Sequence, residues 1–290
     1  MAIGTPEPVW PLAATLGEGP VWSAREGALW FVDIKAPTIH RYHPDTGAQH
    51  TWAAPAQVGW VLPAMAGGMI AGLQTGVHRF DAADGTFTPI AAPEAHLPGN
   101  RLNDATVAAD GAIWFGSMDD AEAADTGRIY RIDASGWRDT GVPPVAITNG
   151  PAFSPDGATL YHHDTSGRAI WASTVADGHV TATRLFATIE DGAGYPDGPC
   201  VDAEGCLWVG LFAGWGARRY DPAGRVVATV PLPVANVTKL AFGGTDLRTA
   251  YVTTATKGLT PAERAEQPLA GALFAFDAGV AGLPGATARV

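Results

Sequence analysis

The segment GEGPVW at residues 17–22 returns in altered form three times along the chain. The later copies read LNDATV at residues 102–107, TNGPAF at residues 148–153 and PDGPCV at residues 196–201. Each copy carries an oxygen-bearing side chain at one equivalent position, next to a small residue or Asp, and then continues into an apolar strand. These side chains belong to Glu18, Asn103, Asn149 and Asp197. The four residues therefore hold one equivalent position in four copies of a repeated unit.

A second apolar strand follows each copy at a nearly constant distance. Its aromatic residue comes 12, 11, 12 and 11 residues after the polar residue. Along the chain, the equivalent second-strand positions recur at spacings of 40, 44, 47, 47 and 43 residues: Trp30, Ile70, Trp114, Tyr161, Trp208 and Tyr251. Repeats of this length, with Gly, Pro, Asp and Asn at the turns, are typical of propeller blades. We therefore predict an all-β, six-bladed propeller in which residues 1–290 form a single domain.

The N-terminal stretch PVWPLAATLG, at residues 8–17, precedes the first unit as an outer strand precedes each later one. We expect it to supply the outer strand of the last blade, which closes the propeller and removes an exposed edge. In the last unit, TKGLTPAERAEQPLAG at residues 256–271 is a long insertion, and Pro261–Glu266 is the only segment that could form a helical turn. With EAHLPGNR at residues 94–101, it is expected to lie over the mouth of the propeller.

Composition limits the partners. Hydrophobic residues make up 47% of the chain and charged residues 16%, which is enough for a large core. Eighteen Lys and Arg against 29 Asp and Glu give a net charge of -11, so the surface should repel nucleic acid and anionic membranes. The N-terminus lacks a basic start and a long apolar run, so we expect a cytoplasmic protein, either a monomer or a weak dimer. Cys200 and Cys206 are expected to be free thiols.

In a propeller, the first strand of every blade lines the central channel. Glu18, Asn103, Asn149 and Asp197 should therefore meet around the axis, while the other two blades contribute Val58 or Gly59 and Thr238 or Lys239. Burying several oxygen side chains without partners is costly, and a bound cation removes that cost. Two carboxylates with amide oxygens suit one divalent ion: calcium, magnesium, manganese, iron(II) or zinc. Since no His or Cys holds such a position, a zinc site built from nitrogen and sulfur is disfavoured.

Each of these residues also has a simpler structural interpretation. Asn149 and Asp197 precede glycines and, taken one at a time, would be read as turn residues. Arg101 could direct its donors at a ligand, or pair with Asp104 or Asp119 as part of the scaffold. Asp119, Asp120 and Glu122 follow a second strand and could line a pocket or belong to a solvated loop. The shared repeat position of the polar residues favours a site.

Five motifs together resemble the senescence marker protein 30, gluconolactonase and regucalcin family: GEGPVW, RLND at residues 101–104, DGAIWFGSM at 110–118, ITNGPAFSPDG at 147–157 and YPDGPCVDAEGCLW at 195–208. The resemblance covers almost the whole chain and is nearest to bacterial sugar-acid lactonases such as the xylonolactonases. It implies a six-bladed propeller that holds a divalent ion on its axis. It also implies that the protein hydrolyses sugar-acid lactones. It also implies metal ligation by Glu18, Asn149 and Asp197, and substrate contacts by Arg101 and Asn103.

One position departs from the family pattern. Animal members carry a substrate-contacting Glu three residues after a GTM motif, and here that position is Ala121. Asp119, Asp120 or Glu122 could take over its role.

The expected reaction is hydrolysis of a sugar lactone to the aldonic acid in oxidative pentose or hexose breakdown. Asp197 is favoured over Glu18 as the base that deprotonates the attacking water, because Tyr195 and a glycine flank it. Two alternatives stay open: a metal-binding propeller without catalysis, and a promiscuous esterase or phosphotriesterase using the same ion.

Overall fold

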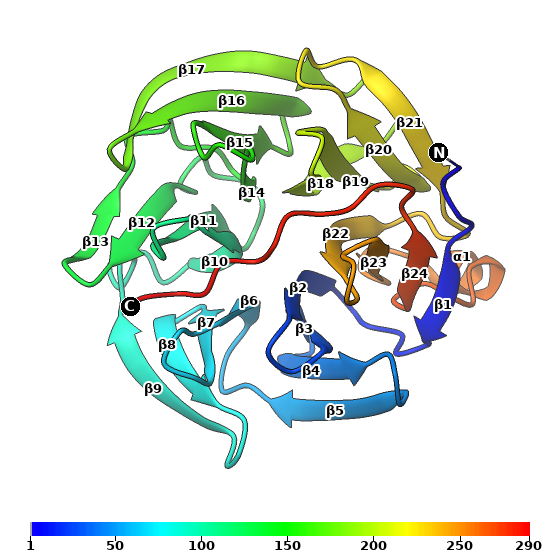
Figure 1. The fold of residues 1–290 in the computed structure, drawn as a ribbon, viewed down its shortest axis with the longest axis horizontal. Helices are drawn as coiled ribbons and strands as arrows, with labels where there is room; N and C mark the ends of the chain where they lie inside the picture. The colour runs from blue at the N-terminus through cyan, green and yellow to red at the C-terminus, as the bar shows by residue number, and fades with distance from the viewer. Residues whose placement is uncertain (1) are drawn as a thin grey trace.

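The computed structural model describes residues 2–290 and is built almost entirely of β-strands. Its 24 strands fall into groups of four, and each group is an antiparallel sheet arranged around a common centre (Figure 1). Four groups are separate sheets, and the other two are joined by one parallel bridge between Gly198 and Lys239. The predicted all-β class is confirmed, and the arrangement is consistent with the predicted propeller.

The strands occupy four positions from the centre outward. The innermost are β2 (Gly17–Ser23), β6 (Val58–Pro63), β10 (Asn100–Val107), β14 (Thr148–Phe153), β18 (Tyr195–Val201) and β22 (Val237–Gly243). The second are β3 (Ala28–Asp33), β7 (Met69–Leu73), β11 (Ile113–Asp119), β15 (Thr159–Asp164), β19 (Leu207–Phe212) and β23 (Thr249–Thr254).

The third strands are β4 (Thr38–His43), β8 (Gly76–Asp81), β12 (Ile129–Asp133), β16 (Ala169–Ala176), β20 (Gly216–Tyr220) and β24 (Leu273–Asp277). The outermost are β5 (Ala48–Ala53), β9 (Thr86–Ala91), β13 (Gly136–Asp139), β17 (His179–Thr188), β21 (Val226–Pro231) and β1 (Glu7–Trp10). One short helix, α1 (Pro261–Glu266), lies in the predicted insertion; Thr260 caps it, and Glu263 completes the capping box.

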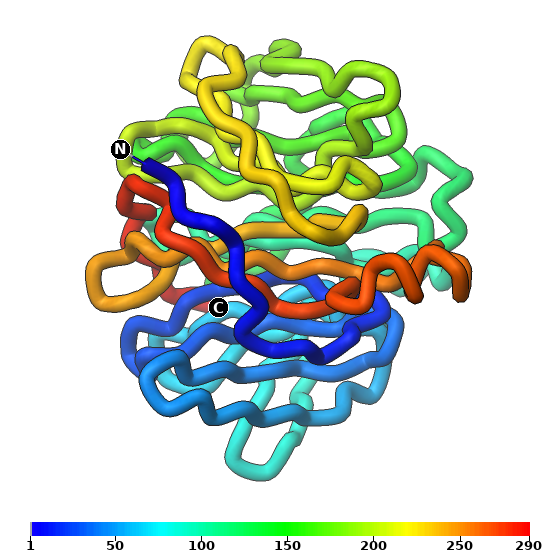
Figure 2. Tube along the Cα trace, turned by 90° about the vertical axis from the view of Figure 1, so that its right-hand side faces the viewer, coloured from blue at the N-terminus to red at the C-terminus, as the bar shows by residue number. Residues whose placement is uncertain are grey.

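The inner strands form a closed circle. Each contacts the inner strand of the next group, and β22 contacts β2. We call the space that these six strands surround the hub. The predicted role of the N-terminal stretch is confirmed, because β1 pairs with β24 through Glu7 with Ala275 and Pro8 with Phe274. Figure 2 shows this N-terminal segment, in blue, running alongside β24.

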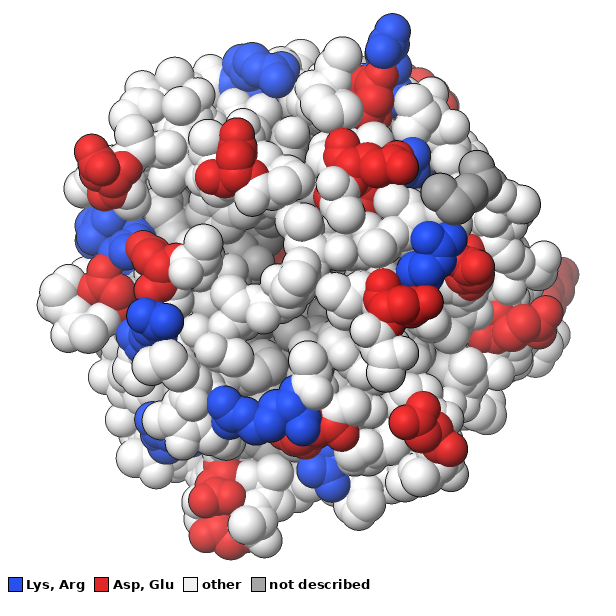
Figure 3. Space-filling model, in the orientation of Figure 1, with Lys and Arg blue, Asp and Glu red and all other residues white. Residues whose placement is uncertain are grey.

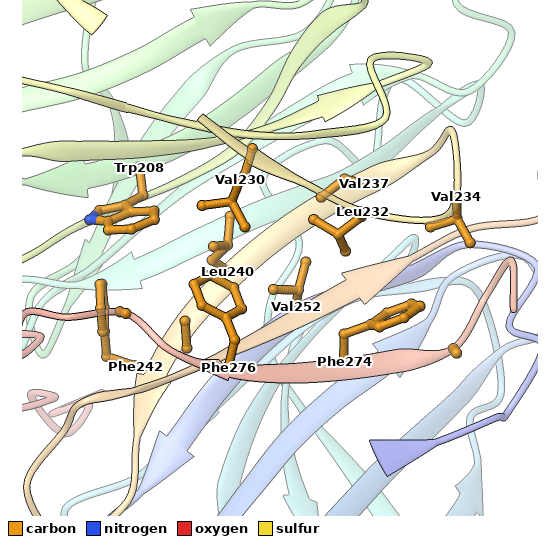
Figure 4. Packing of buried hydrophobic residues seen from close by; sticks show 14 of the residues in the cluster. Trp208, Val230, Leu232, Val234, Val237, Leu240, Phe242, Val252, Phe274 and Phe276 are labelled. Carbon is orange, nitrogen blue, oxygen red and sulfur yellow. The ribbon is translucent and has the colours of Figure 1, made fainter. Parts of the chain in front are cut away.

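Second-strand aromatic residues fill the spaces between neighbouring sheets. Trp30, Trp114 and Trp208 are at most 1% exposed. Figure 4 shows one such interface, where Trp208 and Val230 face Phe242, Phe274 and Phe276 from the next group. The repeat spacing therefore marked core positions, since each sheet buries these side chains against its neighbour.

The C-terminal segment crosses one end of the hub (Figure 1, red). It is held at Gly282 by a bridge to Asp202 and at Ala288 by a bridge to Ala64. Figure 3 shows this face, where acidic and basic side chains are scattered around a largely uncharged, hollowed centre and no basic stripe is visible. Within the described residues, no helix has the length and apolar character needed to cross a membrane.

Cys200 and Cys206 are free thiols, as predicted. They share a hairpin, but the register places Cys200 opposite Trp208, so the two sulfur atoms do not face each other.

The β1 strand should be important for stability. Trp10 is only 8% exposed and packs edge-on against Phe31 and His40, with ring centroids 5.5 and 5.4 Å away. We expect Trp10→Ala to lower the free energy of unfolding by about 3–5 kcal/mol in urea denaturation. Trp137→Ala, on the outer strand β13 and 45% exposed, serves as the control and should cost about 1 kcal/mol or less. Equal losses in the two variants would show that β1 does not fasten the last sheet.

Candidate active site

The polar repeat residues lie where the inner strands bulge. The regular register is interrupted between Glu18 and Val21 in β2, between Asn149 and Ala152 in β14, and between Pro196 and Pro199 in β18. In each of these three strands a proline follows the polar residue by two positions. Proline has no N–H for the ladder and therefore suits such a break, but β10 is interrupted between Leu102 and Ala105 without a proline, so the bulge belongs to the repeat itself.

Glycine is required beside two of these residues by close packing. Gly150 has φ +82°, and an added Cβ would lie 2.9 Å from Pro199 Cγ. At Gly198 an added Cβ would lie 2.5 Å from Lys239 Cγ. The glycines that follow Asn149 and Asp197 therefore let neighbouring inner strands approach closely, a role that a turn interpretation does not explain.

All five predicted site residues line one cavity of about 450 Å³ at one end of the hub: Glu18, Arg101, Asn103, Asn149 and Asp197. The remaining wall comes mainly from Leu16, Met118, Glu122, Ile147, Thr165, Ser166, Tyr195, Phe212 and Lys257. The sequence repeat thus brings together side chains from four different sheets.

Glu18 and Asp197 form a buried carboxyl pair. Their residues are 5% and 6% exposed, and their side chains contact each other directly. Burial, followed by the charge of Asp104, raises the pKa of Glu18 from 4.5 to about 7. Burial, followed by the charge of Glu18, raises the pKa of Asp197 well above its ordinary value. Two carboxylates this close repel each other unless a proton or a cation lies between them.

Asn149 presents its oxygen to the same place. Its Nδ2 donates to Thr165 Oγ1 at 2.9 Å, and Thr165 Oγ1 donates in turn to Pro196 O at 2.8 Å. The Asn149 Oδ1 atom accepts one hydrogen bond, from Asn103 Nδ2 at 3.1 Å, and keeps a second lone pair. The amide is therefore fixed with its acceptor toward the cavity.

These donors fit a hard divalent cation. Two carboxylates and an oriented amide oxygen are the ligand types that such ions prefer, and the two charges of the ion would offset the repulsion between Glu18 and Asp197. Within residues 2–290 no cluster of three or more His, Cys, Asp or Glu side chains is arranged to hold a metal. The fit therefore depends on Asn149 as the third ligand.

Arg101 is held within the protein framework. It is 2% exposed, its Nε donates to Asp120 Oδ1 at 2.9 Å, and its Nη1 donates to Asn103 Oδ1 at 2.6 Å. The scaffold partners considered from the sequence, Asp104 and Asp119, were wrong. Asp104 instead pairs with Lys239 inside the hub, and Asp119 caps its own loop by accepting from Ala123 N and Ala124 N.

Asp120 joins three repeats beside the cavity. Besides Arg101, it accepts from Lys35 Nζ at 2.5 Å and from Gln57 Nε2 at 2.9 Å. Burial alone would raise the pKa of Asp120, but these donors outweigh it and lower the pKa to about 2. Asp120 therefore remains ionised at neutral pH and holds Arg101 in place, while Arg101 orients the Asn103 amide.

Three further residues belong to the site and were not assigned to it from the sequence. His163 Nδ1 donates to the Asp197 backbone oxygen at 2.6 Å and supports that ligand from behind. Glu122, which had been read either as a pocket residue or as part of a solvated loop, lines the cavity and pairs with Lys257. Lys257 lies in the insertion after β23, where no repeat pattern marks it.

The carboxyl pair predicts an unusual pH dependence in metal-free protein. Folded Glu18 keeps its proton up to about pH 7, whereas an unfolded Glu loses it near pH 4.5. In this range Glu18 therefore contributes stability that is lost as pH rises toward 7, whereas His40, His162 and His163, whose pKa values are lowered by burial, contribute in the opposite direction. With chelator present, the difference between Glu18→Gln and wild type isolates the Glu18 contribution, and the substitution should raise the free energy of unfolding at pH 8 by on the order of 1–3 kcal/mol more than at pH 4.5.

Urea denaturation at several pH values checks this prediction. Glu266→Gln, at an exposed position at the end of α1, is the control and should keep the wild-type slope. A difference in unfolding free energy between Glu18→Gln and wild type that stays the same from pH 4.5 to pH 8 would contradict the burial of this pair.

The chain is similar to known proteins over most of its length. Residues 16–256 match the model of the SMP-30/Gluconolactonase/LRE-like region. The chain is 34% identical over 271 residues to 6-deoxy-6-sulfogluconolactonase of Pseudomonas putida, covering 93% of each chain. It is 35% identical over 280 residues to L-arabinolactonase of Azospirillum brasilense, covering 95% of this chain and 92% of that one.

A solved structure extends the likeness to the whole fold. The calcium-binding protein regucalcin from Agrobacterium tumefaciens superposes with a TM-score of 0.94 at 27% identity, covering 100% of this chain and 98% of the other. Since the family model spans most of the sequence and two lactonases match nearly end to end, the chain belongs to the SMP-30/gluconolactonase/LRE-like family.

Proposed function

We propose that this chain is a metal-dependent lactonase that opens a sugar-acid lactone to the aldonic acid, in oxidative pentose or hexose breakdown. The observation that carries the proposal is the buried Glu18 and Asp197 pair, which shares one cavity with the oriented Asn149 oxygen. Lactonase names among the relatives support the reaction class. Those names include a sulfonated gluconolactone, an arabinolactone and a pentonolactone, so they leave the sugar open.

Glu18, Asn149 and Asp197 would hold one divalent ion. Calcium, iron(II), manganese, zinc and magnesium all accept oxygen ligands, and calcium has the support of the regucalcin neighbour, which is described as calcium-binding. Such an ion would supply Lewis-acid stabilisation of the negative charge that develops on the lactone carbonyl oxygen.

The protein side chains supply the rest of the chemistry. Asp197 would accept the proton of the attacking water, because its carboxylate lies in the cavity. Arg101 and Asn103 line the same wall, where their remaining donor and acceptor positions can orient the hydroxyl groups of the substrate. His163 and Thr165 would keep Asp197 and Asn149 in place during turnover.

We further propose that the six groups of four strands are six blades of one domain over residues 1–290, with the catalytic cavity at one end of the hub. The partner is a small sugar lactone, and the scattered charges on the face in Figure 3 give nucleic acid no basic surface there. A cytoplasmic location and a monomer or weak dimer remain predictions from composition.

A second function would be metal binding without catalysis, which the calcium-binding neighbour favours. The two functions differ in what chelation should do. Removing the ion should lower the melting temperature in either case, because Glu18 and Asp197 repel each other without it, but only a catalytic ion should restore turnover when it is returned. Comparing kcat/KM for an aldonolactone with that for phenyl acetate or paraoxon tests the remaining alternative, a promiscuous esterase or phosphotriesterase.

Substitution of the proposed base tests the mechanism. We expect Asp197→Ala to lower kcat for lactone opening by at least about 1000-fold, because it removes both a ligand and a base. Asn103→Ala should mainly raise KM, because Asn103 is assigned to substrate orientation. Lactone opening is measured by the pH drop, starting from stripped protein to which single divalent ions are returned. An Asp197→Ala protein with full activity in chelator would end the proposal.

A further inference from the structure

Two opposite charges meet at the edge of the cavity. Lys257 Nζ contacts the Glu122 carboxylate, and both residues line the cavity wall. They lie 135 residues apart in sequence and come from different sheets, since Glu122 follows β11 and Lys257 follows β23. Their side chains are 36% and 31% exposed, whereas Glu18 and Asp197 are almost fully buried. The pair therefore lies between the carboxyl pair and solvent.

The backbones beneath both side chains are fixed. Lys257 N donates to Thr15 O at 2.9 Å, and Lys257 O accepts from Asn236 Nδ2 at 2.9 Å. Glu122 N donates to Asp119 O at 3.0 Å, within the loop that the Asp119 carboxylate caps. The Lys257 side chain therefore starts from a fixed position at the edge of the cavity whether or not Glu122 is charged.

Of the two cations in the cavity wall, only Lys257 is exposed. Arg101 is 2% exposed and shares Asp120 with Lys35, whereas the Lys257 side chain is 31% exposed and pairs with Glu122. A divalent ion between Glu18 and Asp197 would balance the two carboxylates. Away from the metal position, the cation within reach of an anionic substituent is therefore Lys257, and Glu122 compensates its charge.

We propose that the Glu122–Lys257 pair is a specificity element that selects lactones with uncharged substituents, and that Glu122 masks an anion-binding group, Lys257. This inference rests on the proposed lactonase function. An anionic substituent reaching this wall meets a carboxylate of the same sign, and the repulsion rejects it. A hydroxyl group meets both a donor and an acceptor, which it can hydrogen-bond together.

Glu122→Gln tests whether the Glu122 carboxylate prevents Lys257 from binding an anionic substituent. The probes are D-glucono-1,4-lactone and D-glucaro-1,4-lactone, which differ in a terminal CH₂OH or carboxylate. Wild-type protein should prefer the uncharged lactone. We define the specificity ratio as kcat/KM for the anionic lactone divided by kcat/KM for the neutral one. Glu122→Gln should raise this ratio by about fivefold, mainly by lowering KM for the anionic lactone. The reason is that the substitution leaves the partly exposed Lys257 ammonium without its partner. The double variant Glu122→Gln/Lys257→Met should lose the gain.

Two controls separate specificity from stability. Glu26→Gln breaks a similarly exposed ion pair with Arg41, away from the cavity, and should keep the wild-type ratio. Melting temperatures should barely change, because such exposed pairs contribute little to stability. An unchanged ratio in Glu122→Gln, or the same ratio in the single and double variants, would overturn the inference.

A binding measurement keeps the two proposals distinguishable. If stripped and reloaded wild-type protein opens neither lactone with any divalent ion, the lactonase proposal fails. Calorimetric titration with gluconate and glucarate then still tests the role of the Glu122–Lys257 pair. Glu122→Gln should raise the affinity for the dianion glucarate, relative to that for gluconate, by about fivefold, because Lys257 becomes available to bind it. No shift in that titration would overturn the role of the pair on its own.

Discussion

The structure depends on the burial of two carboxyl groups at the place where separate repeats meet. Glu18 and Asp197 come from sheets far apart in sequence, and the register breaks in β2 and β18 turn both side chains toward the hub. Such a pair is costly without a proton or a cation. The fold accepts this cost beside a cavity at the hub. Local destabilisation of this kind is typical of functional sites.

The cavity is supported by hydrogen bonds that cross from sheet to sheet. Asp120 gathers donors from three repeats, Arg101 transmits that restraint to Asn103, and Asn103 donates to Asn149. On the far side of the carboxyl pair, Asp104 binds Lys239 and accepts from Gly150 N at 3.0 Å. The ligand positions are therefore fixed by contacts between repeats, and bringing an ion in requires little rearrangement.

The sequence was sufficient for the parts of the molecule that repeat. Regular spacing from Trp30 to Tyr251 revealed the sheets and their cores, and the shared position of Glu18, Asn149 and Asp197 placed them in one cavity. It was insufficient for irregular loops. Asp119 and Asp120 are adjacent and chemically identical, and only the fold shows that one caps its loop while the other holds Arg101. Lys257 lies in an insertion that no other repeat shares, so its partner could not be found by spacing.

Pairing of β1 with β24 also has a consequence for synthesis on the ribosome. The outer strand of the last sheet is translated before every other strand, and the strand it pairs with is translated after all of them. The β1 strand therefore has no partner in its sheet until β24 has been made. Closure of the circle consequently follows synthesis of the last strand, and a chain stalled before Leu273 cannot complete it.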